Sequence, residues 1–240
     1  MKNLFRKIKK YFIFLFGDIR REHCLLGFAW GKKEPLISKE EAIEGVSVSK
    51  PGFIGLHRNA GDLSNTAIGG CFKHAWLHVH DSKIVEAVSE GVLLRHALYP
   101  LDTDYAVLLE PIIDKDALDQ AVERVLTIVG TAYDDTFSFD LEREDEIFKD
   151  KVTALDNMKQ YGLGVSCTET VALGFVGHRK ELGLFRVKEM GKLVIMPDNY
   201  MTTHFKVVWA SKSMTVEQAK AFGLPEEGCS ILQDYWDCKK

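Results

Sequence analysis

The sequence predicts an α+β fold, because strand signals gather early in the chain and helix signals do not alternate with them regularly. Apolar–polar alternation at 74–80 and apolar runs at 83–88 and 105–109 indicate strands. Apolar residues at helical spacing in 116–129 and a continuous apolar stretch at 168–175 indicate helices. A doubly wound sheet would require strands and helices in regular alternation, which this order does not provide.

Composition bounds the class of protein. The chain has 240 residues, 46% of them hydrophobic and 28% charged, as in a globular protein with one decorated domain or two small ones. Its formal net charge of -4 gives no reason to expect a nucleic-acid partner. The five cysteines lack paired CxxC spacing, which argues against a zinc site and a disulfide framework. We therefore expect a reducing compartment and neither a metal nor another cofactor.

The chain divides into a basic, amphipathic N-terminal segment with a short helix (1–49), a core domain (50–210) and a C-terminal helical extension (211–240). Residues 1–16 combine basic side chains with an apolar run too short to span a bilayer, and no small-residue cleavage site follows. This segment is either an amphipathic helix on an anionic membrane surface or a basic helix docked on the domain. We expect a cytoplasmic or membrane-peripheral protein, or a virion-associated one if its source is viral.

The first element expected is a short helix, which Ser38 and Glu41 begin as a capping box and Gly45 ends. A Pro-Gly turn at 51–52 then leads into a strand at 53–56.

Later elements have weaker or more local signals. The acidic stretch at 140–150 is interpreted as a solvated excursion. Residues 206–210 are predicted to form a late strand. Residues 215–222 are predicted to form a capped helix that ends at Gly223.

The strand at 74–80 begins a predicted hairpin. Alternation places Ala75, Leu77 and Val79 on one face, and the opposite face receives His74, Trp76, His78 and His80. The turn residues at 81–82 connect it to a returning strand at 83–88. Glu86 shares the face of His74 if the turn has an odd number of residues, and lies on the opposite face if the turn has two.

The candidate chemistry depends on Cys167, which comes directly before the apolar stretch at 168–175. A helix N-terminus favours the nucleophilic thiolate and offers amides for an oxyanion hole, although a lone cysteine here is more often simply core. A papain-like site pairs such a thiol with an imidazole on a neighbouring strand and orients the ring with a third polar residue. His74 and Glu86 suit these two positions.

Three stretches together resemble a known family. They are Pro-Gly-Phe-Ile at 51–54, then 74–77 with 84–87 and 91–92, and then Tyr133-Asp134 followed by Cys167-Thr168-Glu169. Their order and spacing, over about 50–199, resemble the YiiX/YebB-like branch of the NlpC-type cysteine hydrolases. The resemblance implies a circularly permuted papain-like domain, with a small antiparallel sheet and a helix that bears the nucleophile.

Carried over residue by residue, the resemblance implies that Cys167 is the nucleophile, His74 the general base and Glu86 the residue that orients the base. It also implies substrate-site positions for Tyr133 and Glu169. Simpler readings remain open for the last two, because Tyr133 fits a core residue and Glu169 fits a helix cap.

The sequence departs from the family pattern in three places. Phe53 stands where an acid is often found. Trp76 stands where glycine is common, and we expect it to narrow the substrate cleft. An added segment at about 142–163 separates the tyrosine motif from the nucleophile, and we expect a lid or a partner surface there.

Neighbouring candidates are weaker. Cys71 is the rival nucleophile, but it precedes His74 by three residues and is poorly placed to approach the ring in line. His78 and His80 share the face of His74, yet without a carboxylate at ligand spacing they make a poor metal site. Four other histidines are interpreted as surface or structural residues: His57, His96, His178 and His204.

The expected reaction is acyl transfer through a thioester acyl-enzyme, with water as acceptor. The expected substrate is an amide bond of a peptide or peptidoglycan-like molecule, or an acyl-lipid bond. The alternative is a catalytically silent binding module of the same fold, or a structural component contacted through the acidic insertion.

Overall fold

The computed structural model describes most of the chain, namely residues 19–21, 28–30, 34–60, 65, 69–134, 139, 144–149, 154–189 and 192–239. The two predictions for residues 1–16 therefore lie outside the described residues. Within them, no helix has the length and apolar character that a bilayer crossing requires.

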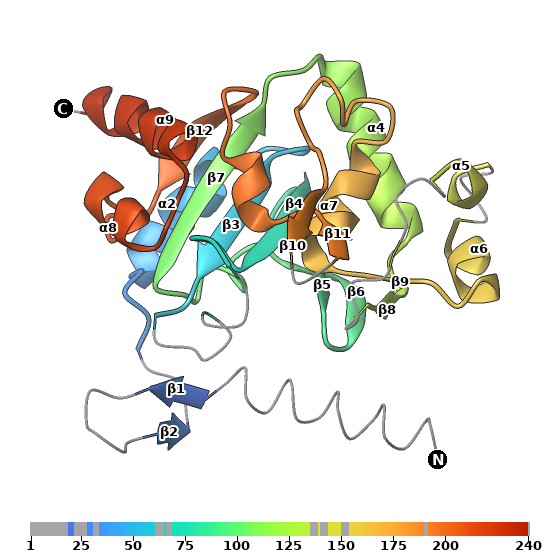
Figure 1. The fold of residues 1–240 in the computed structure, drawn as a ribbon, viewed down its shortest axis with the longest axis horizontal. Helices are drawn as coiled ribbons and strands as arrows, with labels where there is room; N and C mark the ends of the chain where they lie inside the picture. The colour runs from blue at the N-terminus through green and yellow to red at the C-terminus, as the bar shows by residue number, and fades with distance from the viewer. Residues whose placement is uncertain are drawn as a thin grey trace.

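The fold is α+β and is built around a six-stranded antiparallel sheet with strand order β12-β7-β3-β4-β5-β6 (Figure 1). The strands are β3 (Ile54–Arg58), β4 (His74–His80), β5 (Lys83–Val88), β6 (Gly91–His96), β7 (Tyr105–Pro111) and β12 (Phe205–Ala210). The strands expected at 53–56, 74–80, 83–88, 105–109 and 206–210 are confirmed within a few residues. The late strand β12 pairs with β7, so the C-terminal part of the chain completes the sheet.

One face of the sheet carries the larger core. Helices α4 (Lys115–Thr127) and α7 (Cys167–Gly174) pack against each other and against β4 on this face. The apolar side of β4, which includes Ala75 and Leu77, belongs to the same cluster as Val171 of α7. The helices expected at 116–129 and 168–175 are thus confirmed, each shifted by one or two residues.

The opposite face of the sheet packs a smaller cluster that includes Trp76, Leu108 and Trp209. Helix α2 (Lys39–Val48) packs against β12 and begins after the Ser38 cap, as expected. Gly45 does not end this helix, which corrects the sequence interpretation. Gly45 lies inside α2, where a Cβ would come within 3.1 Å of the Trp209 ring.

Helices α8 (Val216–Ala221), capped by Thr215, and α9 (Glu226–Asp237) pack together at the C-terminal end. The remaining elements are β1 (Ile19–Arg21), β2 (Phe28–Trp30), β8 (Ala132–Tyr133), α5 (Glu144–Ile147), α6 (Ala154–Gln160), β9 (Gly164–Val165), β10 (Val187–Glu189), β11 (Lys192–Val194) and the 3-10 helix η3 (Pro197–Tyr200).

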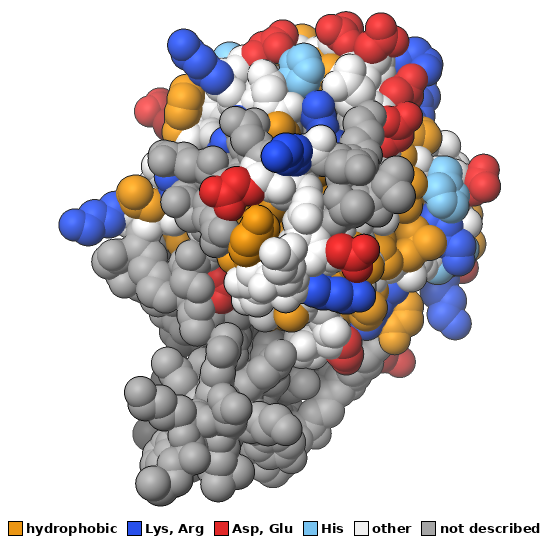
Figure 2. Space-filling view, turned by 90° about the vertical axis from the view of Figure 1, so that its right-hand side faces the viewer, with side chains coloured by type: hydrophobic (Ala, Val, Ile, Leu, Met, Phe, Trp, Pro, Cys, Tyr) orange, Lys and Arg blue, Asp and Glu red, His pale blue; other side chains and the backbone are white. Residues whose placement is uncertain are grey.

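The acidic insertion is more than a solvated excursion. Ile147 of α5 and Met158 of α6 are fully buried in the main core, which a pattern dominated by charged residues did not predict. Over the described side chains in Figure 2, acidic and basic groups are interspersed with hydrophobic ones, without a broad basic field on that face.

Candidate functional site

A two-residue turn closes the β4–β5 hairpin, with His80 paired to Lys83. Such a turn alone would put Glu86 on the face opposite to His74. A register shift between His78 and His80 inserts one extra residue, so that Glu86 pairs directly with Trp76. Directly paired residues share a face, and residues two apart on a strand do so as well. The bulge therefore brings Glu86 to the side of His74.

His74 and Glu86 form a close pair on this face. The Nε2 atom of His74 lies 2.8 Å from Oε2 of Glu86, and the side chains are 16% and 4% exposed. The other carboxylate oxygen, Oε1, lies 3.4 Å from Nη1 of Arg95 on β6. Both oxygens of a nearly buried carboxylate thus have cationic or hydrogen-bonding partners, which fixes its orientation.

Helix α7 begins at Cys167 because the preceding residue forms a reciprocal cap. The Ser166 hydroxyl accepts the Glu169 N–H at 3.4 Å, and the Glu169 carboxylate accepts the Ser166 N–H at 2.7 Å. All eight residues of α7 are buried, and Cys167 itself is 7% exposed. The cap therefore holds the cysteine at the first position of a rigid, internal helix.

The body of α7 covers the Ala75 side of the sheet, whereas His74 shares the opposite face with Trp76. Cys167 and His74 nevertheless lie within electrostatic range of each other. We attribute this meeting to their positions as the first residues of α7 and β4, at the end of the sheet. Because Nε2 is bound to Glu86, Nδ1 is the ring nitrogen left for the thiol.

The electrostatics of the pair favour an imidazolium. Burial lowers the pKa of His74, but a Cys167 thiolate and hydrogen bonds to Cys167 and Glu86 outweigh it and raise that pKa above its usual range. Burial raises the pKa of Glu86, while the hydrogen bond and charge of His74 outweigh it and lower that pKa. The pair is therefore suited to an imidazolium beside a carboxylate.

The other predicted site residues lie in different settings. Tyr133 is partly buried on β8, where it pairs with Val165, two residues before the nucleophile candidate. The carboxylate of Glu169 caps α7, as its simpler interpretation held, and burial raises its pKa to about 7.

Trp76 does not line an open cleft. It is 2% exposed, and its ring lies so close to Gly55 that a Cβ there would clash with it. The expectation that Trp76 narrows a substrate cleft is therefore corrected, because the ring fills the smaller core.

The rival groups have structural partners. Cys71 is fully buried, and burial raises the pKa of its thiol. His78 Nε2 lies 2.6 Å from the carbonyl oxygen of Asp81 and so holds the hairpin turn. Among the described residues, no group of three or more His, Cys, Asp or Glu side chains could hold a metal ion.

A carboxylate clamp fixes the chain just before His74. The Asp198 carboxylate of η3 accepts the Cys71 N–H at 2.6 Å and the Phe72 N–H at 2.7 Å. Gly70, with φ +83, permits this approach, because a Cβ there would clash with Asp198 Oδ2. The start of β4 is thus tied to a segment that follows α7 in the chain.

Sequence reasoning missed three neighbours of the site. His57 and Arg95 flank His74 and Glu86, and buried Tyr200 donates its hydroxyl to the Thr168 carbonyl of α7 at 2.8 Å. Their positions depend on strand register and on distant packing. A local pattern gives no signal for either.

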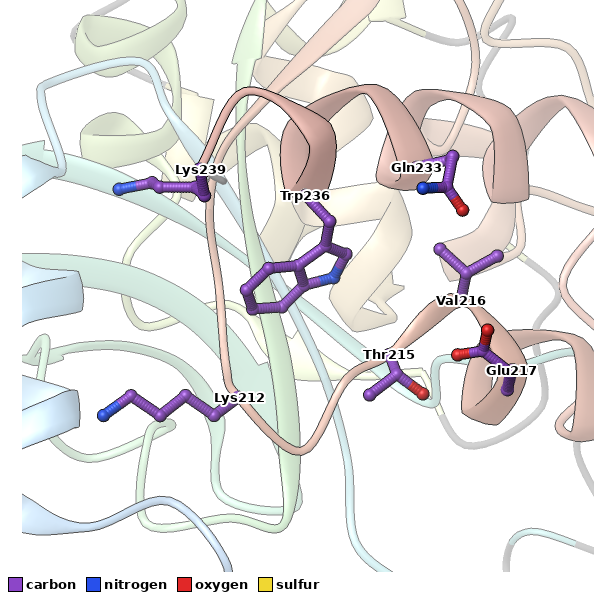
Figure 3. A pocket seen from close by; sticks show the side chains of 7 residues that line it. All are labelled: Lys212, Thr215, Val216, Glu217, Gln233, Trp236 and Lys239. Atoms are coloured by element: carbon purple, nitrogen blue, oxygen red, sulfur yellow. The ribbon is translucent and has the colours of Figure 1, made fainter.

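Pockets occur beside the site and away from it. A small one of about 100 Å³ is lined by residues that include Tyr133, Asp134 and Gly164. A larger one of about 400 Å³ lies between α9 and the chain around α8, with Trp236 between Lys212 and Lys239 (Figure 3). None of the predicted site residues lines this larger pocket. Comparisons of the chain with family models, curated proteins and solved structures find no match.

Proposed function

We propose that this protein is a cysteine hydrolase or acyltransferase with a permuted papain-like (NlpC-type) catalytic domain. The observation that carries the proposal is the 2.8 Å contact between His74 and Glu86 on a ring that also interacts with Cys167. A thiol at a helix start, an imidazole and an orienting carboxylate are the parts that nucleophilic cysteine catalysis requires.

In the proposed mechanism, the Cys167 thiolate attacks the substrate carbonyl carbon and forms a carbon–sulfur bond. His74, as imidazolium, gives its proton to the leaving amine or alcohol when the acyl bond breaks. Neutral His74 then takes a proton from water, whose oxygen attacks the thioester. The acid departs and the thiolate returns, so all atoms and charges balance.

Helix α7 would stabilise the oxyanion. Its first intrahelical bond runs from the Thr170 N–H to the Ser166 carbonyl, so the Cys167 and Thr168 amides precede the helical ladder. Donors of this kind, aimed at the developing negative charge, are a major part of acyl-transfer catalysis.

The acyl donor proposed is a peptide or peptidoglycan-like amide, or an acyl lipid, with water as acceptor. A panel of p-nitrophenyl acyl esters and peptide p-nitroanilides tests both bond types. Intact-mass spectrometry under rapid acid quench should detect an acyl adduct that maps to Cys167.

Cys167→Ala should abolish both turnover and the adduct. Cys238→Ala is the matched control, since Cys238 is an exposed free cysteine, and it should leave both unchanged. An intact, folded wild-type protein that acylates at no cysteine across the panel would leave the silent binding or structural module as the better account.

A further inference from the structure

Four polar side chains cross four adjacent strands of the sheet. His57 on β3 pairs with His74 on β4, while Glu86 on β5 and Arg95 on β6 follow along the same face. Their contacts are continuous, and only the two central residues were expected from the sequence.

Arg95 engages the outer side of Glu86. Its Nη1 lies 3.4 Å from Oε1, and its guanidinium carbon lies 4.8 Å from the centre of the Tyr99 ring. Arg95 is thus held on two sides, by a carboxylate and by an aromatic face. Because Oε2 of Glu86 is hydrogen-bonded to His74, the carboxylate has little freedom to rotate.

His57 engages the outer side of His74. Its Nδ1 lies 2.8 Å from the Pro100 carbonyl oxygen, which can only accept, so Nδ1 carries the proton. The ring centres of His57 and His74 are 4.9 Å apart, and His57 also meets Trp76 edge-on at 5.5 Å. A fixed neutral ring therefore packs beside the proposed base.

We propose that Arg95 and His57 are positioning residues of the proposed site. Arg95 fixes the carboxylate of Glu86, and His57 confines the ring of His74. The inference rests on the proposed function, because it assigns these residues to the same reaction. Neither residue touches the reacting atoms.

The charges around Glu86 are consistent with this assignment. The charged groups that act on it are His74 from β4 and Arg95 from β6, while the ring of His57 from β3 lies beside His74 and Glu90 lies at the following turn. Burial and the charge of His74 lower the pKa of His57 to about 3, so its ring stays neutral beside an imidazolium.

The experiment measures two quantities in the full chain: the pH profile of Cys167 alkylation by iodoacetamide, and the titration of the Glu86 carboxyl carbon by ¹³C NMR. Arg95→Met should raise the titration midpoint of the Glu86 carboxyl by about 0.5–1 pH unit, since a nearby cation favours the carboxylate. The acid limb of the alkylation pH profile should move to higher pH by the same amount. Arg95→Lys should restore most of both shifts. Lys206→Met, which removes an exposed cation from β12, should change neither.

His57→Ala should slow alkylation by about three- to tenfold at pH 7, because the freed ring spends less time aligned with the thiol. His57→Gln, which keeps an N–H donor for Pro100, should lose less. Melting temperatures identify any variant that is merely unfolded.

The two proposals fail differently. A rapidly alkylated wild-type Cys167 with unchanged profiles in Arg95→Met and His57→Ala would overturn the positioning roles and leave the proposed function standing. A wild-type Cys167 that forms no acyl adduct would refute the function. The NMR shift in Arg95→Met would then still show whether Arg95 controls Glu86, and its absence would refute that role as well.

Discussion

Replacing Glu86 with glutamine should slow the alkylation of Cys167 at pH 6 about five- to thirtyfold. Glutamine keeps the shape and one acceptor oxygen but removes the negative charge that supports the imidazolium. A hydrogen bond to a charged group contributes about 1.5–3 kcal/mol and a neutral one about 0.5–1.5, so the change removes roughly 1–2 kcal/mol. Each 1.4 kcal/mol corresponds to about one tenfold step in the thiolate–imidazolium population.

The pH of the assay follows from the sign of the pKa change. The pKa of Glu86 is lowered in the folded protein. Its stabilising effect is therefore fully present above the unfolded pKa, about 4.3, and is lost as the pH falls through the folded value. At pH 6 the Glu86 carboxylate is charged in the folded and in the unfolded protein, so Glu86→Gln removes its entire stabilising effect. The same loss should lower the melting temperature by roughly 2–8 °C in a protein of this size.

The assay is iodoacetamide labelling with mass-spectrometric mapping of each cysteine. Glu90→Gln is the matched control, since Glu90 is nearby and exposed and contacts Ser89, and its labelling rate should equal wild type. Cys71, buried and with its pKa raised, should stay unlabelled until unfolding. A Glu86→Gln rate within twofold of wild type at pH 6 would refute the assigned orientation and charge support.

Three further outcomes are expected. His74→Ala should slow Cys167 alkylation strongly at pH 6 and little at pH 9, because ion pairing and not access is lost; equal slowing at both pH values in the same labelling assay would contradict this. Gly55→Ala should destabilise the fold by about 3 kcal/mol or more in urea titrations, since its Cβ would overlap the Trp76 ring; a smaller loss would show that the ring can move. Deleting residues 1–16 should abolish sedimentation with anionic liposomes if they form a membrane-surface helix, whereas a melting temperature lowered by several degrees with unchanged liposome binding would identify a docked helix.

Local signals predicted the elements better than the geometry that joins them. The strand that begins at His74 and the helix that begins at Cys167 follow from periodicity and capping, which depend on a few neighbouring residues. The bulge that returns Glu86 to the face of His74 depends on packing across the whole hairpin. Sequence alternation therefore predicts that Glu86 lies either on the face of His74 or on the opposite face, but it does not determine which.

Tertiary contacts account for the other differences. His57 joins the site through strand pairing with β4, which lies further along the chain, and no local pattern distinguishes it from the remaining histidines. The family resemblance predicts Trp76 near a cleft because its position matches a family glycine, whereas the space left by Gly55 lets its ring enter the interior. Ile147 is buried although acidic residues surround it in sequence.

The clamp between Asp198 and the amides of Cys71 and Phe72 has a consequence for biosynthesis. The chain leaves the ribosome N-terminus first, so Cys71 and Phe72 emerge before the Asp198 carboxylate that holds them. Asp198 follows Cys71 by 127 positions and Phe72 by 126 positions in the sequence. The edge strand β12 is synthesised later still. A nascent chain that stops short of η3 thus lacks the tie that holds the start of β4. The start of β4, and His74 with it, is therefore fixed only after η3 has been synthesised.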